Sequence, residues 1–189
     1  MKALIVGANG QLGQELRALF PQAQAVDFKE LDISDSGAVQ NYDWSKFEII
    51  LNAAAYTKVD ESETPEGMVK AWMVNALGVA NLASAARQHR LSLVHVSTDY
   101  VFDGLKQGEY SEDNPIKPQS NYGRSKAAGD LAATSAPNHY LIRTSWVIGK
   151  GPNFVRTMLK LGSERNEVSV VDDQQGRPTF ASDLAASSK

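Results

Sequence analysis

The stretch VGANGQLG near the start of the chain places Gly7, Gly10 and Gly13 between a short apolar run and a helical pattern. The run, Ala3–Val6, is typical of a buried strand. Glycine permits a tight turn, lets the backbone approach a pyrophosphate and allows the helix to pack close to the strand. The amide groups at the helix N-terminus would then face the phosphates. The motif predicts a dinucleotide site, although an ordinary strand–helix turn can also contain these glycines.

Further short apolar runs alternate with longer helical patterns along the chain. This alternation predicts a Rossmann-like α/β fold, a doubly wound parallel sheet with helices on both faces. The strands are continuous apolar runs, as expected for strands that are covered on both faces. Strands are expected at 3–6, 23–27, 49–52, 92–97 and 140–144, and helices at 11–20, 36–42, 65–89 and 122–135.

The pattern changes near residue 150. We expect residues 1–150 to form a dinucleotide-binding domain and residues 151–189 to begin a smaller substrate-binding region that is incomplete in this sequence. In the second part we expect a helix over FVRTMLKLGSE, a short strand and a polar turn over EVSVVDDQQGRPTF, and the start of another helix at 182–187. Residues 103–119 are rich in Gly, Pro and charge and are predicted to form a long surface loop, a kind of segment that is often functional.

Composition restricts the class of partner. The net charge is −3 and the chain has no basic block, which argues against nucleic acid or an anionic membrane as the main partner. The sequence contains no cysteine, so disulfides and thiolate metal sites are excluded. Its three histidines have no metal-ligand spacing. The N-terminal apolar run is too short and too glycine-rich for a signal peptide or a membrane span, and a cytoplasmic protein is expected.

Acidic and basic residues after the second strand bear on cofactor choice. Asp27 ends this strand, where an acid usually accepts hydrogen bonds from the adenosine ribose and favours NAD. Lys29 is close enough in sequence to suit the 2′-phosphate of NADP. Asp32 could contact the adenine, but Asp32 and Lys29 are equally typical of a solvated turn. The choice between NADH and NADPH therefore stays open.

Small residues follow the third strand in the stretch LNAAAYT. Ala53, Ala54 and Ala55 would let a cofactor lie against the backbone at little steric cost. Alanine is also common in tightly packed cores, which is the alternative explanation. Together with the glycine pattern upstream, these residues indicate one wall of the cofactor site.

Tyr122 and Lys126 in SNYGRSKA lie four residues apart, so a helix would place them on one face. The pair alone is also common at the solvated start of a helix. Reduction of a ketone requires a proton for the new alkoxide, and free tyrosine has a pKa of about 10. A neighbouring Lys⁺ stabilises the phenolate and lowers that pKa. We therefore predict Tyr122 as general acid, with Lys126 lowering its pKa and binding the nicotinamide ribose.

The stretch HVSTDYVFDG ends the fourth strand, and ligands of open α/β sheets bind beyond the carboxyl ends of strands. Thr98 could polarise the substrate carbonyl, or it could simply cap the backbone. Asp99 and Tyr100 fit a substrate contact and a structural role equally well. A structural role is expected for His95, as a satisfied sheet residue, and for Glu61 and Glu63, as a solvated face.

Five stretches together resemble the dTDP-4-dehydrorhamnose reductases, which are extended short-chain dehydrogenases/reductases. They are VGANGQLG, LNAAAYTKVDESE, VHVSTDYVFDG, NYGRSKAAGD and LIRTSWVIGKGPNF. Tyr-x-x-x-Lys and the glycine pattern belong to the whole superfamily, whereas STDYVFDG and RTSWV are more specific. The resemblance covers essentially the whole chain. It implies transfer of a hydride from NADPH or NADH to C4 of dTDP-4-dehydro-L-rhamnose, giving dTDP-L-rhamnose for surface polysaccharides.

The resemblance also implies roles for individual residues. The matching catalytic residues are Thr98, Tyr122 and Lys126, and those of the phosphate-binding turn are Gly10, Gln11 and Leu12. Other matching cofactor contacts are Asp27, Asp32, Ile33, Ala55, Tyr56 and Thr57, and the sugar nucleotide would meet Thr98, Asp99 and Trp146. Some members hold Mg²⁺ at a dimer contact, for which Glu15 would be the matching ligand. Its partners would lie partly beyond residue 189, so no metal ligand is assigned, and a homodimer stays an open expectation.

Family members continue well past residue 189, so binding of the nucleotide sugar and turnover by this chain stay open. One alternative is a non-catalytic regulatory subunit of the methionine adenosyltransferase type, which shares the fold. The intact set Thr98, Tyr122 and Lys126 argues against it. Another alternative is a nucleotide-sugar epimerase or dehydratase. A dehydratase usually has Thr-Asp-Glu at this point, whereas here Tyr100 follows Asp99.

Overall fold

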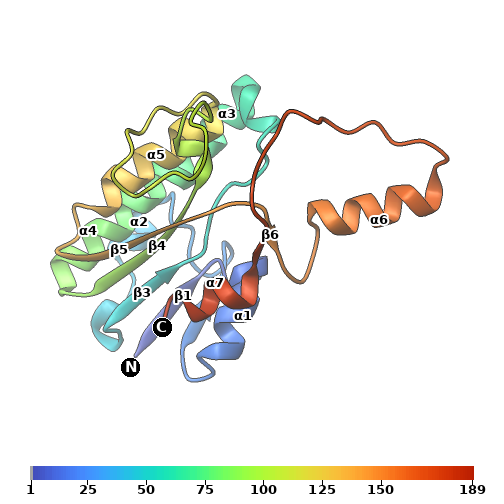
Figure 1. Ribbon diagram of the computed structural model, residues 1–189. Coiled ribbons are helices and arrows are strands. Elements are labelled where there is room, and N and C mark those ends of the chain that lie inside the picture. Colours follow the sequence, from blue (N-terminus) through green and yellow to red (C-terminus); the bar gives the residue numbers. More distant parts are fainter. Residues whose placement is uncertain (1) are drawn as a thin grey trace.

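A sheet of five parallel strands forms the centre of the computed structural model, which describes residues 2–189 (Figure 1). The strands lie in the order β2-β1-β3-β4-β5. Their bounds are β1 (Ala3–Val6), β2 (Gln24–Val26), β3 (Ile49–Asn52), β4 (Ser92–Thr98) and β5 (Asn138–Thr144). From β1 the chain moves outward to β2 and then returns past β1 to β3, so the winding direction reverses between β1 and β3. Crevices at such reversal points bind ligands in open α/β sheets.

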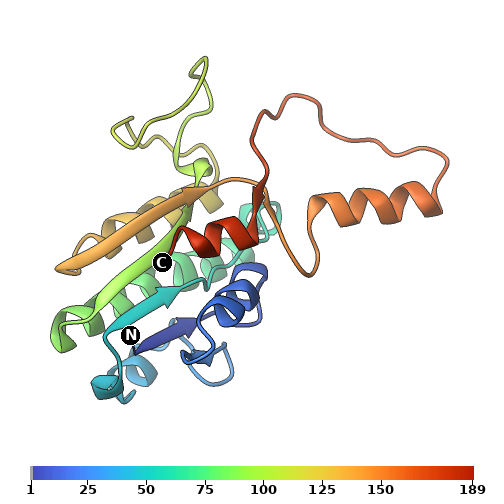
Figure 2. The ribbon, with the colours of Figure 1, turned by 60° about the horizontal axis from the view of Figure 1, so that its bottom comes forward.

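Helices cover both faces of the sheet, as the continuous apolar strands predict (Figures 1 and 2). Along β1, Leu4 and Val6 face one hydrophobic core, and Ala3 and Ile5 face the other. The first core is closed by α2 (Ser36–Gln40), α4 (Val79–His89) and α5 (Asn121–Ala133), and the second by α1 (Gln11–Leu19) and α7 (Ala181–Ala186). The Rossmann-like α/β prediction is confirmed.

The helix expected over 65–89 is interrupted. It consists of α3 (Pro65–Trp72), a π-helical turn η3 (Met73–Gly78) and α4. Thr64 caps α3 by accepting a hydrogen bond from the amide of Gly67, and Pro65 occupies the first turn, where it needs no partner. A π-helical turn inside a helix often marks a functional site.

The helix α5 packs closely on η3. A Cβ atom at Gly129 of α5 would overlap the carbonyl oxygen of Asn75 in η3. The helix begins where Ser120 accepts a hydrogen bond from the amide of Gly123, close to the predicted start. Glycine at 129 therefore sets how near α5 can approach its neighbour.

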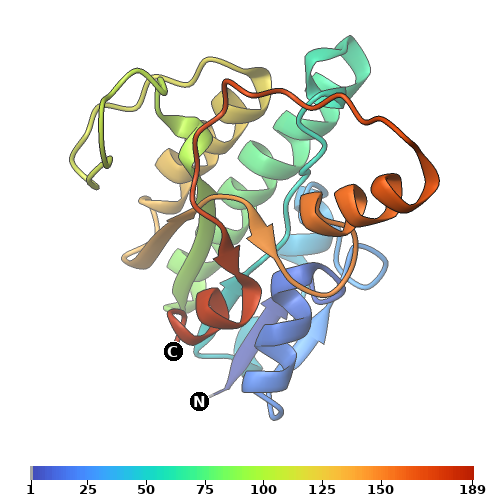
Figure 3. The ribbon, with the colours of Figure 1, turned by 45° about the vertical axis from the view of Figure 1, so that its right-hand side comes forward.

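Residues after 144 extend away from the sheet and then return. Strand β6 (Val147–Ile148) pairs with β7 (Thr179–Phe180), and α6 (Phe154–Glu164) projects from the body between them (Figures 1 and 3). The helix α7 lies beside α1, close to the predicted position 182–187. A domain boundary near residue 150 stays a prediction. No helix within residues 2–189 has the length and apolar character needed to cross a lipid bilayer.

The strand expected within EVSVVDDQQGRPTF is wrong over most of that stretch. Residues 167–178 form neither helix nor strand, and pairing begins only at Thr179. The valines at 168, 170 and 171 have high strand propensity, but a strand forms only where a neighbouring strand edge accepts its hydrogen bonds. The loop expected over SWVIGKGPNF likewise contains the short strand β6, while residues 103–119 form the predicted loop.

Gly129→Ala should lower the free energy of unfolding by about 2 kcal/mol, because the new methyl group must displace backbone at η3. Gly162→Ala is the matched control, since Gly162 is also helical but has no atom near its added Cβ. We expect that control to raise the free energy of unfolding by about 0.5–1 kcal/mol, because alanine favours a helix over glycine. Urea unfolding measures both, and equal effects would contradict the close packing of α5 on η3.

Candidate active site

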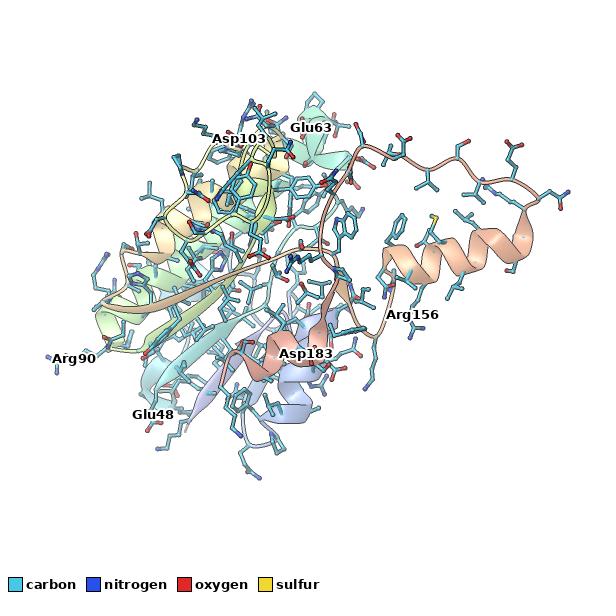
Figure 4. All side chains as sticks on the ribbon, in the orientation of Figure 1. Glu48, Glu63, Arg90, Asp103, Arg156 and Asp183 are labelled. Atoms are coloured by element: carbon cyan, nitrogen blue, oxygen red, sulfur yellow. The ribbon has the colours of Figure 1, made fainter. Side chains whose placement is uncertain are left out.

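The predicted site residues gather at one edge of the sheet, beyond the carboxyl ends of the strands. Asp103 and Glu63 lie at this end of the molecule, whereas Glu48 and Arg90, which precede β3 and β4, lie at the opposite end (Figure 4). The parallel strands bring the segments that follow β1, β2, β3 and β4 to this one edge.

The glycine turn after β1 forms a cradle that side chains would fill. Gly7 has φ +79°, and a Cβ there would lie 2.5 Å from the amide nitrogen of Ala54. A Cβ at Gly13 would overlap the carbonyl oxygen of Gly7. Gly10 precedes α1 and offers no side-chain cap, so amides of the first helical turn remain for a ligand. This shape and its donors fit the pyrophosphate of a dinucleotide.

Asp27 lies directly beside this turn. One carboxylate oxygen accepts a hydrogen bond from the amide of Asn9 at 2.8 Å, and the other accepts from the amide of Phe28 at 2.8 Å. The carboxylate therefore holds the glycine turn against the end of β2. Asp32 instead accepts hydrogen bonds from the amide and hydroxyl of Ser34, which closes its own turn.

Other residues expected at the cofactor have structural partners of their own. The side-chain oxygen of Gln11 accepts from the amide of Gly149 at 2.9 Å and from Asn153, which ties α1 to the segment after β6. The side chains of Leu12 and Ile33 are buried in the two hydrophobic cores. A ligand could therefore reach these two residues only through their backbone.

The segment after β3, which contains Ala53, Ala54, Ala55, Tyr56 and Thr57, is held by a residue that the sequence analysis missed. Asn75 of η3 accepts from the Tyr56 amide at 2.8 Å and donates to the Tyr56 carbonyl at 3.0 Å. Its amide also donates to the hydroxyl of Ser125 on α5. Asn75 is fully buried. A lone asparagine inside the apolar helical stretch WMVNALG was the available signal, because such a residue needs partners.

The structure brings Thr98 and Tyr122 together from segments far apart in sequence. The hydroxyl of Thr98 is close enough to the hydroxyl of Tyr122 to lower the pKa of Tyr122, and both side chains are buried. Thr98 also donates to Asp99 at 3.0 Å and accepts from the amide of Tyr100 at 3.2 Å, so it caps the backbone as well. The Tyr100 and Tyr122 rings meet edge to face with centroids 5.6 Å apart.

Lys126 is buried, and its ammonium donates to the carbonyl of Val96 in β4 at 2.7 Å. Burial lowers the pKa of Lys126 to about 8, while the carboxylate of Asp130 acts in the opposite direction. The Lys126 side chain therefore points into the protein and ends beside the last residues of β4.

The prediction that Lys126 lowers the pKa of Tyr122 is wrong for this structure. Burial raises the pKa of Tyr122 to about 12; the hydrogen bond from Thr98 opposes the rise, and nearby Asp99 adds to it. The groups that shift the pKa of Tyr122 do not include Lys126, whose ammonium donates to a strand carbonyl. Tyr122 is accordingly a neutral phenol near neutral pH.

Trp146, a predicted substrate contact, has an unusual backbone. Its φ is +43°, which is rare for a bulky residue, and such conformations cluster at functional sites. The indole packs on Gly176, where an added Cβ would lie 2.8 Å from the ring. The amide of Thr179 donates to the Trp146 carbonyl at 3.2 Å. The segment around β7 therefore fixes the orientation of this side chain.

His95 and the two glutamates depart in part from their expected roles. The Nδ1 atom of His95 is 3.0 Å from the side-chain nitrogen of Asn52. Its buried Nε2 has no hydrogen-bond partner among residues 2–189, so the imidazole does not make all the hydrogen bonds it could. Glu63 accepts from the backbone and side chain of Asn121 and so anchors the start of α5. Glu61 forms an ion pair with Lys58.

No group of three metal-ligating side chains occurs in the described part of the chain. Glu15, the residue considered for Mg²⁺, lies 3.8 Å from the ammonium of Lys150. A cation already neutralises this carboxylate, so the structure gives Mg²⁺ no support.

The glycine cradle, the parallel sheet and the Tyr122–Lys126 helix together define a dinucleotide-binding, Rossmann-like protein of the short-chain dehydrogenase/reductase type. More narrowly, the chain belongs to the family described as RmlD substrate binding domain, whose model matches residues 1–188.

Named relatives agree with this assignment. The chain is 46% identical to a dTDP-4-dehydrorhamnose reductase of Aggregatibacter actinomycetemcomitans, covering 98% of this chain and 65% of the relative. It is 40% identical to the spore coat polysaccharide biosynthesis protein SpsK of Bacillus subtilis, covering 97% of this chain and 67% of the relative. The chain thus spans about two thirds of the length of the curated relatives it matches.

Solved structures show the same fold. A dTDP-4-dehydrorhamnose reductase from Clostridium acetobutylicum superposes with a TM-score of 0.92 at 40% identity, covering 100% of this chain and 69% of that one. The enzyme of the same name from Bacillus anthracis, in complex with NADP, gives 0.92 at 42% identity, covering 99% and 69%.

His95 should make stability fall in acid. Burial and the charge of Lys126 lower its pKa well below the ordinary value, so the unfolded chain binds a proton first as pH falls. The stabilisation is complete above about pH 6.5 and is lost below it, by up to about 1.4 kcal/mol per pH unit. Urea unfolding at several pH values should show a shallower acid slope for His95→Gln. The exposed His89 provides the control His89→Gln, and equal slopes in all three proteins would refute the buried neutral imidazole.

Proposed function

We propose that this chain forms the cofactor-binding and catalytic part of a reductase. The reductase transfers a hydride from NADPH or NADH to the C4 ketone of dTDP-4-dehydro-L-rhamnose and yields dTDP-L-rhamnose. The observation that carries this proposal is the approach of the buried Thr98 and Tyr122 hydroxyls, with the buried Lys126 one turn along the same helix, at the same sheet edge as the glycine cradle. The names of the relatives support the substrate class.

The proton of the reaction comes from Tyr122. When bound, the nicotinamide supplies the hydride, which forms the new C–H bond at C4. The electron pair of the carbonyl moves to oxygen, and the Tyr122 hydroxyl gives its proton there to form the alcohol. Since burial holds the pKa of Tyr122 at about 12, the phenol keeps its proton until an alkoxide develops. Thr98, whose hydroxyl donates to Asp99 in this structure, would turn its proton to the same oxygen and orient the ketone.

The residues of this chain also fit the cofactor. The cradle at Gly7 and Gly13 and the free amides at the start of α1 would hold the pyrophosphate, and Asp27 would accept from the adenosine ribose. Lys126 is the residue that would donate a hydrogen bond to the nicotinamide ribose. A nicotinamide cofactor is consistent with NADP in the related Bacillus anthracis structure.

The alternatives have weaker support. A binding-only subunit has no need for a buried hydroxyl pair beside a buried ammonium. The dTDP-glucose 4,6-dehydratase DesIV of Streptomyces venezuelae is only 21% identical and shares the fold alone. Several relatives with 40–46% identity are instead named dTDP-4-dehydrorhamnose reductase.

Tyr122→Phe should reduce turnover at least about 100-fold, because it removes the proton donor, while the affinity for NADPH and NADH stays unchanged. The assay follows cofactor oxidation by dTDP-4-dehydrorhamnose, with cofactor binding titrated separately. Tyr140→Phe is the control, since Tyr140 is exposed on β5. Undiminished turnover in Tyr122→Phe would refute the mechanism. Cofactor binding without any oxidation, both in the unaltered chain and in a full-length version, would favour the binding-only subunit.

Asp27→Asn should shift cofactor preference towards NADPH. The carboxylate beside the glycine turn repels a 2′-phosphate, and its removal should raise the NADPH-to-NADH affinity ratio about tenfold, or about 1.4 kcal/mol. Calorimetric titration of both cofactors measures the ratio. Glu48→Gln, at the opposite end of the sheet, should leave it unchanged. An unchanged ratio in Asp27→Asn would place the adenosine ribose elsewhere.

A further inference from the structure

The helix α5 buries polar side chains as well as the apolar Ala133. Ser125, Lys126 and Asp130 are all buried, and Asp130 follows Lys126 by one helical turn. Residues at this spacing lie on the same helix face. Two opposite charges are thus enclosed between α5 and the strands β4 and β5.

Asp130 has two kinds of contact in this enclosure. One of its oxygens lies 3.2 Å from Nε of Arg143 on β5, in a partly buried ion pair. Its other oxygen, Oδ1, has no hydrogen-bond partner within residues 2–189, although the hydroxyl of Ser97 is close enough to lower the pKa of the carboxyl. A buried carboxylate oxygen without a hydrogen bond is costly unless a nearby charge compensates it.

Lys126 is a buried cation that requires an opposite charge nearby. Its ammonium is fully buried, and its hydrogen bond in the described structure goes to the neutral carbonyl of Val96. A buried ammonium without an opposite charge tends to lose its proton. The carboxylate of Asp130, one turn along the helix, is the opposite charge that favours the protonated form.

We propose that Asp130 is a positioning residue for Lys126: its carboxylate keeps the ammonium charged and directed to the end of β4, and Arg143 holds that carboxylate in place. The catalytic importance of this arrangement rests on the proposed function, because Lys126 acts there beside the nicotinamide ribose. The electrostatic coupling itself does not depend on that function.

Other charged and titratable groups face the pair and must be counted. His95 lies on β4 and Arg143 on β5. Tyr122 lies one turn before Lys126 on α5, and Asp99 and Tyr100 both raise the pKa of Tyr122. The turn η3 contributes the uncharged Asn75. Burial lowers the pKa of Lys126 to about 8 and raises that of Asp130, while Lys126 and Arg143 both lower that of Asp130. Loss of either charge should therefore move the proton equilibrium of Lys126.

A purely structural role for Asp130 makes a different prediction. If the ion pair only ties α5 to β5, then Asp130→Asn and Arg143→Gln should destabilise the fold alike and leave Lys126 unaffected. Under the proposal the two variants act in opposite directions. Without Asp130, the Lys126 ammonium loses its opposite charge and faces only the positive Arg143, so its pKa falls. Without Arg143, the Asp130 carboxylate interacts with Lys126 alone, so the pKa of Lys126 rises.

The decisive experiment is an NMR titration of the full chain labelled with ¹³C in lysine side chains, with Lys126 assigned from the signal lost in Lys126→Met. Asp130→Asn should lower the pKa of Lys126 by about one pH unit, and Arg143→Gln should raise it. If either variant leaves that pKa unchanged, or both move it in the same direction, the proposal is overturned. Should Asp130→Asn fail to fold, Arg143→Gln decides alone: a rise supports the proposal, and a fall or no change overturns it.

The activity measurement separates this proposal from the proposed function. In the pH profile of kcat/KM, the basic limb should move to lower pH in Asp130→Asn and return toward the original in Asp130→Glu. If the NMR shifts occur but neither the unaltered chain nor a full-length version oxidises NADPH or NADH, the proposed function fails and the coupling stands. If the unaltered chain is active but Asp130→Asn leaves both the pKa of Lys126 and the pH profile unchanged, the coupling fails and the function stands.

Discussion

The hydrogen bond from the Lys126 ammonium to the Val96 carbonyl, 2.7 Å long, is the interaction on which this end of the molecule depends. It places a positive charge inside the protein, where charge is expensive. The side chains around the ammonium offset that cost. Asp130 supplies an opposite charge, Arg143 neutralises Asp130, and Ser97 and His95 line the same side of the sheet.

The approach of α5 to its neighbours converts this polar face into a site. A Cβ at Gly129 would overlap the carbonyl of Asn75, and one at Gly123 would overlap the carbonyl of Tyr100. Glycine at both positions lets the helix contact η3 and the segment after β4 directly. That contact brings the hydroxyl of Tyr122 to Thr98, so backbone packing determines the geometry of the reacting groups.

The features foreseen from sequence are those with local signals. The apolar run of β1, the glycines of the cradle and the spacing of Tyr122 and Lys126 each lie within a short stretch. Asn75 and Asp130 were missed because their partners come from other elements, Tyr56 and Ser125 for the one and Arg143 for the other. The valines of residues 167–171 misled for the same reason, since strand pairing needs an edge that the sequence does not reveal. Spacing likewise placed Lys126 near Tyr122 without showing that the strand carbonyl would bind its ammonium.

The shifted pKa values of Tyr122 and Lys126 have a common origin, and they bear on which direction of the reaction the site favours. Burial disfavours charge on both groups, so the pKa of Tyr122 rises to about 12 and that of Lys126 falls to about 8. A neutral phenol can donate a proton, whereas oxidation of an alcohol would require a phenolate to accept one. The negative charge of Asp99 disfavours that phenolate further. Under the proposed function, this protonation state suits the reduction step, whereas the reverse step needs the phenolate, which high pH or a bound group that stabilises the phenolate would favour.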